Sequence, residues 1–449
     1  MIGVLGGGIA GLSAAYRLQR RGYDVQVFEA SEDLGGLAAV YETAGNPVEK
    51  FYHHLSKSEQ TIVDLAEELG VGDRIDWRYG QNAYYVDGIV HPMDKPWEIL
   101  AFPHWSLYDK FRLGMLTLDV DVRGPIPRFD TYENLEDFED VSAVEFAREH
   151  TTDNVYETFF EPLLEAKFGS RKEDVSAAWL LGRIKFRGER DLLRGEILGY
   201  FDGSFGVFID ALRDAVGREN VTTGARVTDV GIAEGAVDSM TVERRARESE
   251  AAADGGTLTE THEVEAVVVA AMPNVLEALT GYTCDVEFQG TICSLVSMDE
   301  PLTDTYWLNV KDDASFGALI EHTNFVPPER YGGDHLLYVA RYVQDSTEEL
   351  WGLSDDAVED RWIRGIRNLF PDFDPASIRE IRTARNPQTA PIYEQGYLDM
   401  VIQYDLGDQI AEGVYYAGMA SRAQYPERSL NGGVVAGFEC ADRIHEKDD

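Results

Sequence analysis

The first thirty residues carry apolar and polar positions in the order of a strand, a turn, a helix and a second strand. Residues 2–5 are a short apolar run, and residues 12–21 place apolar side chains at helical spacing until Gly22 ends the pattern. Residues 24–28 are a second apolar run, and Glu29 follows it directly. The pattern predicts a β-α-β unit at the start of the chain.

The chain that follows is rich in helical patterns and aromatic residues before strands return in its second half. Two capping boxes, Ser56 with Glu59 and Ser142 with Glu145, are expected to begin helices. The aromatic segment Trp97–Leu118 is expected to pack on its own domain, with a lid or a membrane-surface helix as the alternatives. Further expected elements are helices over 155–168, 204–216, 354–370 and 431–444 and strands over 221–223, 226–232, 264–271 and 413–417.

A glycine-rich turn joins the first strand to the first helix. Residues 6–11 read Gly-Gly-Gly-Ile-Ala-Gly, which matches G-x-G-x-x-G. Gly6 permits a tight turn, Gly8 lets a diphosphate approach the backbone, and Gly11 lets the helix pack closely on the strand. Glu29, placed after the second strand, is positioned to accept hydrogen bonds from a ribose 2′-hydroxyl. These features in this order indicate a dinucleotide site with the diphosphate at the helix N-terminus.

The charge balance excludes some classes of partner. The chain of 449 residues has 40 Lys and Arg against 81 Asp and Glu, a formal net charge of −41. This charge excludes a nucleic-acid binder that works through a basic face, and it disfavours binding to an anionic membrane. Because molar salt screens such self-repulsion, we expect a halophilic source such as a haloarchaeon, the alternative being an ordinary acidic protein.

The cysteines and the start of the chain indicate its compartment. Cys284, Cys293 and Cys440 are too few for a disulfide framework and lack CxxC spacing, so we expect neither disulfides nor a metal site. The chain passes from Met1 straight into the first strand, and no uncharged apolar run is long enough to cross a bilayer. We expect a cytoplasmic globular protein without stable membrane insertion, and the oligomeric state stays open.

Further glycine motifs extend the pattern to the whole chain. The pair Gly35-Gly36 follows soon after Glu29, and the C-terminal region has a strand, Gly418 and the pair Gly432-Gly433 at the last helix. With the opening β-α-β unit and the strand at 267–273, these motifs resemble FAD-dependent oxidoreductases of the amine oxidase superfamily. The protoporphyrinogen oxidase, carotenoid desaturase and UDP-galactopyranose mutase branches are the most similar.

The resemblance implies an α/β fold built from two interleaved domains. The first would be a discontinuous Rossmann-type FAD-binding domain, and the second a mixed α+β substrate domain that binds a small molecule between the two. The FAD-binding domain would comprise residues 1–45, 205–290 and 385–449, and the substrate domain residues 46–204 and 291–384.

The resemblance also implies which residues contact FAD. The adenosine would lie near Glu29 and Val227, and the diphosphate over the two glycine loops. The N-terminus of the last helix would face the pyrimidine edge of the flavin, where negative charge develops on reduction. The implied contacts are Gly6, Gly8, Ile9, Ala10, Gly11, Glu29, Ala30, Gly35, Gly36, Leu37, Val227, Gly418, Met419, Gly433 and Val434.

Three positions depart from the pattern of the superfamily. Leu37 stands where amine oxidases usually have Arg, so that diphosphate contact is lost or supplied from elsewhere. Met419 stands where Asp or Glu is common, which leaves only its backbone N–H to contact the cofactor. The loop 421–430 contains no Cys, so we expect non-covalent FAD.

Four residues are candidates for catalysis. Tyr52-His53-His54 falls where related branches place residues beside the flavin, and a histidine there could move protons because its pKa is ordinarily near neutrality. The alternative is a hydrogen-bonded histidine that fixes the start of a helix. Arg428 could hold a carboxylate or phosphate of the substrate, or it could pair with one of many acids. Tyr425 lies in the same loop, which the resemblance returns to the flavin.

The expected reaction is hydride transfer between a small organic substrate and flavin N5. One alternative is a redox-neutral reaction of the mutase type on a nucleotide sugar, which would occur only with reduced flavin. Another alternative is a flavin-binding protein without catalysis, such as a sensor. Neither the substrate nor the electron acceptor follows from the sequence.

Overall fold

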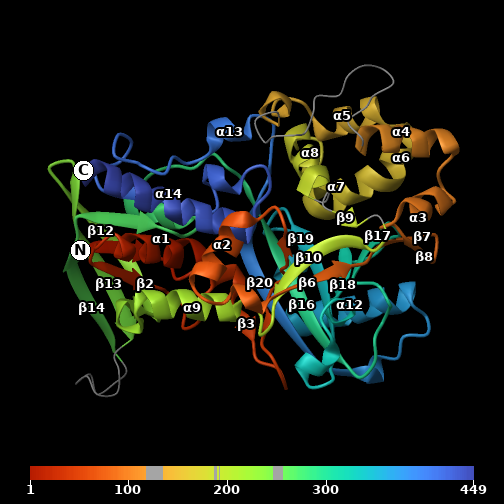
Figure 1. Cartoon of the computed structure of the whole chain (residues 1–449), viewed down its shortest axis with the longest axis horizontal. Helices are drawn as coiled ribbons and strands as arrows, with labels where there is room; N and C mark the ends of the chain where they lie inside the picture. Colours follow the sequence, from red (N-terminus) through yellow and green to blue (C-terminus); the bar gives the residue numbers. More distant parts are fainter. Residues whose placement is uncertain (118–134, 187–189, 192, 246–255, 449) are drawn as a thin grey trace.

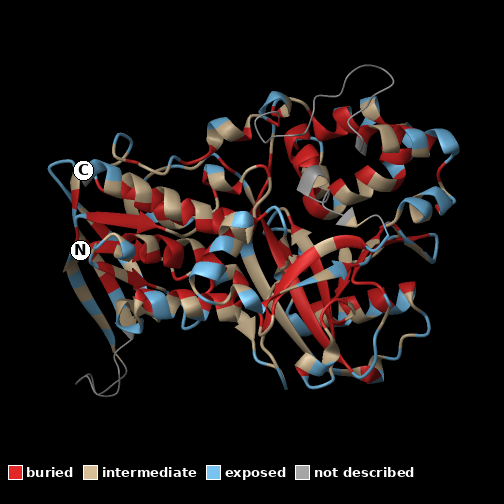
Figure 2. Cartoon of the chain, viewed as in Figure 1, coloured by how far each residue is buried: buried red, intermediate tan, exposed pale blue. Residues whose placement is uncertain are grey.

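The computed structural model describes residues 1–117, 135–186, 190–191, 193–245 and 256–448. Figure 1 shows an elongated molecule with a layered α/β part at one end, which holds both termini. The other end contains a large sheet and, beside it, a cluster of helices. Figure 2 shows that the strands at the centre of both ends are buried.

A five-stranded parallel sheet forms the centre of the α/β part. β1 (Ile2–Leu5) lies between β2 (Val25–Phe28) and β15 (Ala266–Val269), with parallel pairing on both sides. All residues of β1 and β15 are buried, as expected for strands covered on both faces. The strand order is β11 (Val221–Thr222), β2, β1, β15 and β21 (Val414–Tyr416).

Helices cover one face of this sheet and a smaller sheet covers the other. Leu12 and Leu18 of the first helix are fully buried against Val4 and Val27. On the opposite face, Met240 packs in the same cluster as Val267 and Val269. The helices are α1 (Ile9–Arg20), α9 (Gly206–Val216) and α14 (Leu430–Asp448), and Figure 1 shows α1 between the other two. The smaller antiparallel sheet contains β12 (Ala225–Ala233), β13 (Ala236–Arg245) and β14 (Thr257–Glu263).

A seven-stranded sheet dominates the other end of the molecule. Its central strands alternate between two clusters: Tyr338 packs toward the α/β part, and Val339 packs against Trp362. Trp362 belongs to α12 (Asp355–Leu369), which begins at Ser354, whose side chain accepts a hydrogen bond from the Ala357 N–H. The strand order is β20 (Ile378–Pro391), β16 (Phe288–Met298), β19 (His335–Val343), β18 (Ala318–Glu321), β17 (Trp307–Val310), β7 (Asn82–Val86) and β8 (Ile89–Pro92).

The remaining elements are short strands and helices. The strands are β3 (Val40–Tyr41) with β4 (Val48–Glu49), and β5 (Leu55–Ser56), β10 (Gly195–Phe201), β6 (Ile75–Gly80) and β9 (Arg190–Asp191). The helices are α2 (Gln60–Glu68), α3 (Pro96–Ala101), α4 (Leu107–Thr117), α5 (Ala143–His150), α6 (Asp153–Val155), α7 (Glu161–Phe168), α8 (Ala177–Phe186), α10 (Pro273–Thr280), α11 (Glu349–Gly352) and α13 (Tyr397–Met400). Among them, α4 to α8 form the helical cluster beside the large sheet (Figure 1).

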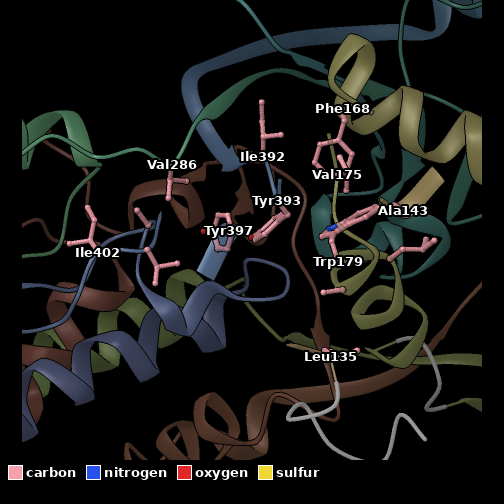
Figure 3. Packing of buried hydrophobic residues seen from close by; sticks show 14 of the residues in the cluster. Leu135, Ala143, Phe168, Val175, Trp179, Val286, Ile392, Tyr393, Tyr397 and Ile402 are labelled. Carbon is pink, nitrogen blue, oxygen red and sulfur yellow. The ribbon is translucent and has the colours of Figure 1, made fainter. Parts of the chain in front are cut away.

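The helical cluster is anchored by a large buried tryptophan. Figure 3 shows Trp179 of α8 beside Phe168 of α7 and Val175. Its ring meets the Phe168 ring edge to face, with centroids 4.7 Å apart. Tyr393 and Tyr397 belong to the same buried cluster, so the helices are fixed to the segment that follows β20.

Several expected elements differ in detail. Ser56 lies in β5 and does not cap α2, because only half of the capping box forms: Glu59 accepts a hydrogen bond from the Ser56 N–H at 2.7 Å. Ser142 does cap α5, since its side chain accepts from the Val144 N–H. The helix expected over 155–168 contains a π-helical turn at Tyr156–Phe160.

The aromatic segment Trp97–Leu118 forms two helices, α3 and α4, up to Thr117, and Leu118 lies outside the described residues. Trp105 is 3% exposed and packs in the buried cluster, whereas Leu107 is 81% exposed. The segment therefore packs on its own part of the chain and also presents apolar side chains to solvent. The division into two domains stays a prediction, and β20 crosses its boundary at 385 to remain in the seven-stranded sheet.

Candidate functional site

A cavity of about 540 Å³ lies where the two parts of the molecule meet. The first glycine turn contributes Gly8 to its wall, and the start of α14 contributes Gly433. The seven-stranded sheet contributes Trp307 of β17 and Tyr342 of β19, and the helical cluster contributes Lys167 of α7. One chamber therefore joins the predicted dinucleotide site to side chains from distant parts of the chain.

The first glycine turn forms an open cradle. Gly8 begins α1 with φ −77° and ψ 178°, and a Cβ added there would meet no atom within 4 Å. Gly11 is the opposite case, because its Cβ would lie 2.0 Å from the carbonyl oxygen of Gly6. The first turn of α1 contains no acidic residue, and no side chain caps the helix at Gly8. Ile9 and Ala10 line the cavity, so the start of the helix can donate hydrogen bonds to a ligand there. This geometry fits a diphosphate.

The second glycine pair lies against the first. The Gly35 N–H donates to the carbonyl oxygen of Gly7 at 2.9 Å, and Gly35 has a φ of +101° that favours glycine. A Cβ on Gly36 would lie 3.7 Å from the Cα of Gly8. Leu37 follows in the cavity wall, so an apolar side chain stands where the superfamily pattern usually has arginine.

Glu29 closes the turn and lines the cavity. Its Oε2 accepts a hydrogen bond from the Gly7 N–H at 2.7 Å, and its Oε1 accepts bonds from the backbone and hydroxyl of Ser31. The carboxylate therefore helps to hold the glycine turn in addition to any contact with a ribose.

A second helix N-terminus reaches the cavity. Ser429 caps α14, because its Oγ accepts a hydrogen bond from the Gly432 N–H at 2.9 Å. Asn431 fixes this turn to α2 by accepting from the Ile62 N–H at 2.9 Å. Leu430 and Gly433 line the cavity, so the partial positive charge of the helix is directed at its contents.

Most residues expected to contact FAD line this cavity. They are Gly6, Gly8, Ile9, Ala10, Glu29, Gly35, Gly36, Leu37, Gly418, Met419 and Gly433. Four others do not: Gly11 packs against Gly6, Ala30 is exposed, Val227 lies on β12, and Val434 is buried in the core.

Both histidines line the cavity, and His53 differs from the expectation of a near-neutral pKa. His53 is partly buried, and its Nδ1 lies 2.6 Å from the carbonyl oxygen of Phe51. Because a carbonyl only accepts, Nδ1 carries the proton and Nε2 is an acceptor. Burial and the nearby charge of Arg428 lower the pKa of His53 to about 3, so it is neutral at neutral pH. His54 also lines the cavity, with Nδ1 3.0 Å from the Tyr306 hydroxyl.

Arg428 enters the cavity beside two tyrosines. Its Nη2 lies 3.4 Å from the Tyr342 hydroxyl, and its buried Nε has no hydrogen-bond partner. Among the described residues no carboxylate forms an ion pair with it. Burial acts to raise the pKa of Tyr342, but Arg428, Lys167 and a hydrogen bond from Tyr52 outweigh burial and lower it. The pairing of Arg428 with a nearby acid, which the sequence left open, is therefore not seen in the described part of the chain.

Tyr425 does not join the other candidates. Its hydroxyl donates to Glu139 Oε2 at 2.7 Å, and its ring stacks on Tyr397 in the buried cluster beside the helices. It is absent from the cavity wall although Glu427 and Arg428, two and three residues later, are part of it. Tyr425 therefore anchors the loop through Glu139 and Tyr397, outside the cavity wall.

The sequence did not single out Lys167, Arg183 or Tyr342. Lys167 forms a salt bridge with Glu427, and Arg183 Nη1 lies 2.9 Å from the same carboxylate. One signal was present in the sequence, because Lys167 stands between Leu164 and Phe168, which are buried on the same helix.

Among the described residues, no group of three or more His, Cys, Asp or Glu side chains could hold a metal ion. No helix in the same residues has both the length and the apolar character needed to cross a membrane.

Known proteins share parts of this sequence and all of this fold. Coproporphyrinogen III oxidase of Propionibacterium freudenreichii is 26% identical over 209 residues, which are 44% of this chain and 37% of that protein. The chain spans less than two fifths of the length of the curated relatives it matches.

Among solved structures, an oxidoreductase from Methanosarcina mazei has a TM-score of 0.69 at 15% identity, covering 98% of this chain and 99% of that one. Reduced UDP-galactopyranose mutase has a TM-score of 0.71 at 15% identity, covering 99% of this chain and 95% of that one. These likenesses show a shared fold.

The sequence model of one family, described as flavin containing amine oxidoreductase, matches residues 9–445. This match begins inside the first glycine turn and ends in α14, so it includes both helix N-termini at the cavity. The chain belongs to the flavin containing amine oxidoreductase family.

Proposed function

We propose that this protein is an FAD-dependent oxidoreductase that transfers hydride between a small organic substrate and flavin N5. The observation that carries the proposal is the single chamber in which the glycine cradle at Gly8 is continuous with a polar wall containing His53, Tyr342 and Arg428. A flavin-binding protein without catalysis would not need this second, polar wall.

The residues present fit the cofactor. Gly8 and the start of α1 would hold the diphosphate, Glu29 the adenosine ribose, and the start of α14 the pyrimidine edge of the ring. When bound, FAD supplies the hydride acceptor that no side chain of the protein provides. None of the three cysteines lines the cavity, which supports the proposal that the cofactor is held without a covalent thioether bond.

The side chains of the polar wall would position the substrate and handle its proton. His53 presents an unprotonated Nε2 at neutral pH, which can accept a hydrogen bond from the substrate, although its low pKa makes it a weak base.

Anaerobic reduction tests the proposal. Amines, porphyrinogens, polyenes and nucleotide sugars would be added separately to the purified protein with FAD, in high salt and without oxygen. We expect one class to bleach the flavin absorbance within a single turnover. The proposal fails if no class exchanges electrons with the bound flavin.

A redox-neutral mutase is the second candidate, because the cationic side chain of Arg428 suits the phosphates of a nucleotide sugar. Isomerisation of a nucleotide sugar only by the reduced protein, with no consumption of an electron acceptor, would select this candidate over the first.

A further inference from the structure

One part of the chamber wall concentrates positive charge. Lys167 of α7 and Arg183 of α8 approach the same carboxylate, that of Glu427. Arg183 is held at 2.9 Å and 3.3 Å from its two oxygens. One internal counterion therefore serves two cations, and both are in the wall of the chamber.

Arg428 adds a third cation without a counterion in the described part of the chain. Its Nη2 lies 3.4 Å from the hydroxyl of Tyr342, and its Nε has no hydrogen-bond partner. A guanidinium stays protonated at all ordinary pH values. A buried guanidinium that meets only a neutral phenol is costly, so this position is suited to an external anion.

The tyrosines beside Arg428 respond to this charge. Burial alone raises the pKa of a phenol, and Tyr52 follows that rule. The pKa of Tyr342 is instead lowered, because Arg428 and Lys167 favour its ionised form and Tyr52 donates a hydrogen bond to it. The chamber therefore has a positive potential at this point.

The acids in the wall do not cancel this potential. Besides Glu427, the wall contains Glu29, Glu196 and Glu59. Glu29 lies at the glycine turn, where it accepts hydrogen bonds from the Gly7 and Ser31 N–H groups. Glu196 accepts a hydrogen bond from the Asn82 side chain at 3.0 Å, and its charge helps to raise the pKa of Arg183. Burial raises the pKa of Glu59 to about 7, so much of its negative charge is absent near neutral pH. Arg428 keeps its surplus charge.

The cations belong to the part of the chamber that does not hold the glycine cradle. Lys167 and Arg183 come from the helical cluster, and Arg428 lies in the loop before α14 with its side chain beside Tyr342 of the seven-stranded sheet. An anion at this point would therefore belong to the substrate and not to the diphosphate at Gly8.

We propose that Arg428, with Arg183 and Lys167 beside it, forms an anion-binding subsite, and that the substrate carries a carboxylate or a phosphate group that binds there. The inference rests on the proposed function, since it names the substrate class of the same chamber. An amine without an acidic group would be repelled from this wall, and a hydrocarbon polyene would leave its charges unpaired.

Calorimetry with simple probes tests the subsite without turnover. The flavin-loaded protein would be titrated with glutarate, glycerol 2-phosphate and putrescine, which differ in charge and in the kind of anion. We expect saturable binding of at least one anion and none of putrescine. The glutarate and phosphate arms show which anion the substrate carries. Tighter binding of putrescine than of either anion, or no binding of any probe, would overturn the inference.

Two variants with opposite expected effects on anion affinity distinguish a change in the subsite from misfolding. Arg428→Gln should weaken anion binding about tenfold or more, because a charge-assisted hydrogen bond is lost. Glu427→Gln should strengthen anion binding several-fold, because it frees Arg183 from its internal counterion. Arg218→Gln is the control, since Arg218 is exposed and pairs with Asp214 away from the chamber.

The variants also separate this inference from its foundation. If Arg428→Gln loses FAD but binds the anion with unchanged affinity, Arg428 serves the cofactor and the subsite is wrong. If the anions bind as expected but no organic anion bleaches the flavin, the proposed oxidoreductase is wrong and the subsite stands. If only an uncharged or cationic compound bleaches the flavin, the oxidoreductase stands and the subsite is wrong.

Discussion

Two glycines in one turn should respond in opposite ways to the same added methyl group. In Gly8→Ala the new Cβ meets no protein atom within 4 Å, and the φ of −77° suits alanine. Replacing glycine gains about 0.4–1 kcal/mol through the unfolded chain. Alanine is a poorer helix N-cap by about the same amount. The free energy of unfolding of the flavin-free protein should therefore change by less than about 1 kcal/mol.

The same methyl group should abolish flavin binding, because it occupies the space in which the diphosphate approaches the backbone. A flavin present at a hundred times its dissociation constant stabilises the native protein by about 2.7 kcal/mol. Gly8→Ala should lose all of this stabilisation while keeping the flavin-free stability of the wild type.

Gly11→Ala should instead destabilise the protein itself. Its Cβ would lie 2.0 Å from the Gly6 carbonyl oxygen, a backbone atom that cannot rotate away. Overpacking of this kind costs about 1–3 kcal/mol and occasionally more, and we expect the upper end of that range.

The assay is urea unfolding of both flavin-free variants, followed by titration with FAD monitored by quenching of its fluorescence. The reasoning is refuted if Gly8→Ala binds FAD as tightly as the wild type. It is equally refuted if flavin-free Gly11→Ala is as stable as the wild type.

Three further predictions follow from charged groups. Glu29→Ala should weaken FAD binding by about 1–3 kcal/mol, with Glu29→Gln losing less because it keeps an acceptor for the Gly7 N–H; equal affinities in both variants and the wild type would contradict this. Burial raises the pKa of Glu49 from 4.5 to about 7, so the folded state binds its proton more tightly and stability falls as pH rises from about 4.5 to 7. The free energy of unfolding of Glu49→Gln should therefore rise by about 3 kcal/mol relative to that of the wild type as the pH increases from about 4.5 to 7. Urea unfolding measures both values, and a difference that does not change with pH would refute the prediction. The net charge of −41 predicts that the free energy of unfolding rises between low and molar potassium chloride, and full stability without salt would contradict it.

The first glycine turn was predictable because its determinants are local. The strand, the turn at residues 6–11, the helix and Glu29 follow one another within thirty residues, and each has a backbone or spacing requirement that the sequence displays. The capping boxes predicted one helix start of two: Ser142 caps its helix as expected, whereas Ser56 lies in β5.

The polar wall of the chamber was less predictable because its members meet only in the folded chain. Lys167 and Tyr342 come from a helix and a strand far apart in sequence, and only the buried position of Lys167 gave a local signal. The same limit applies to protonation. His53 was expected to titrate near neutrality, but burial and Arg428 prevent this, and neither effect is visible in the sequence.

The central claim is that the chamber holds one FAD per chain without a covalent bond. The direct measurement is to incubate the purified protein with FAD, remove the excess, and denature it, then quantify the flavin released into solution by its absorbance. We expect one FAD per chain, all of it released. A protein that stays colourless and does not bind added FAD would contradict this expectation.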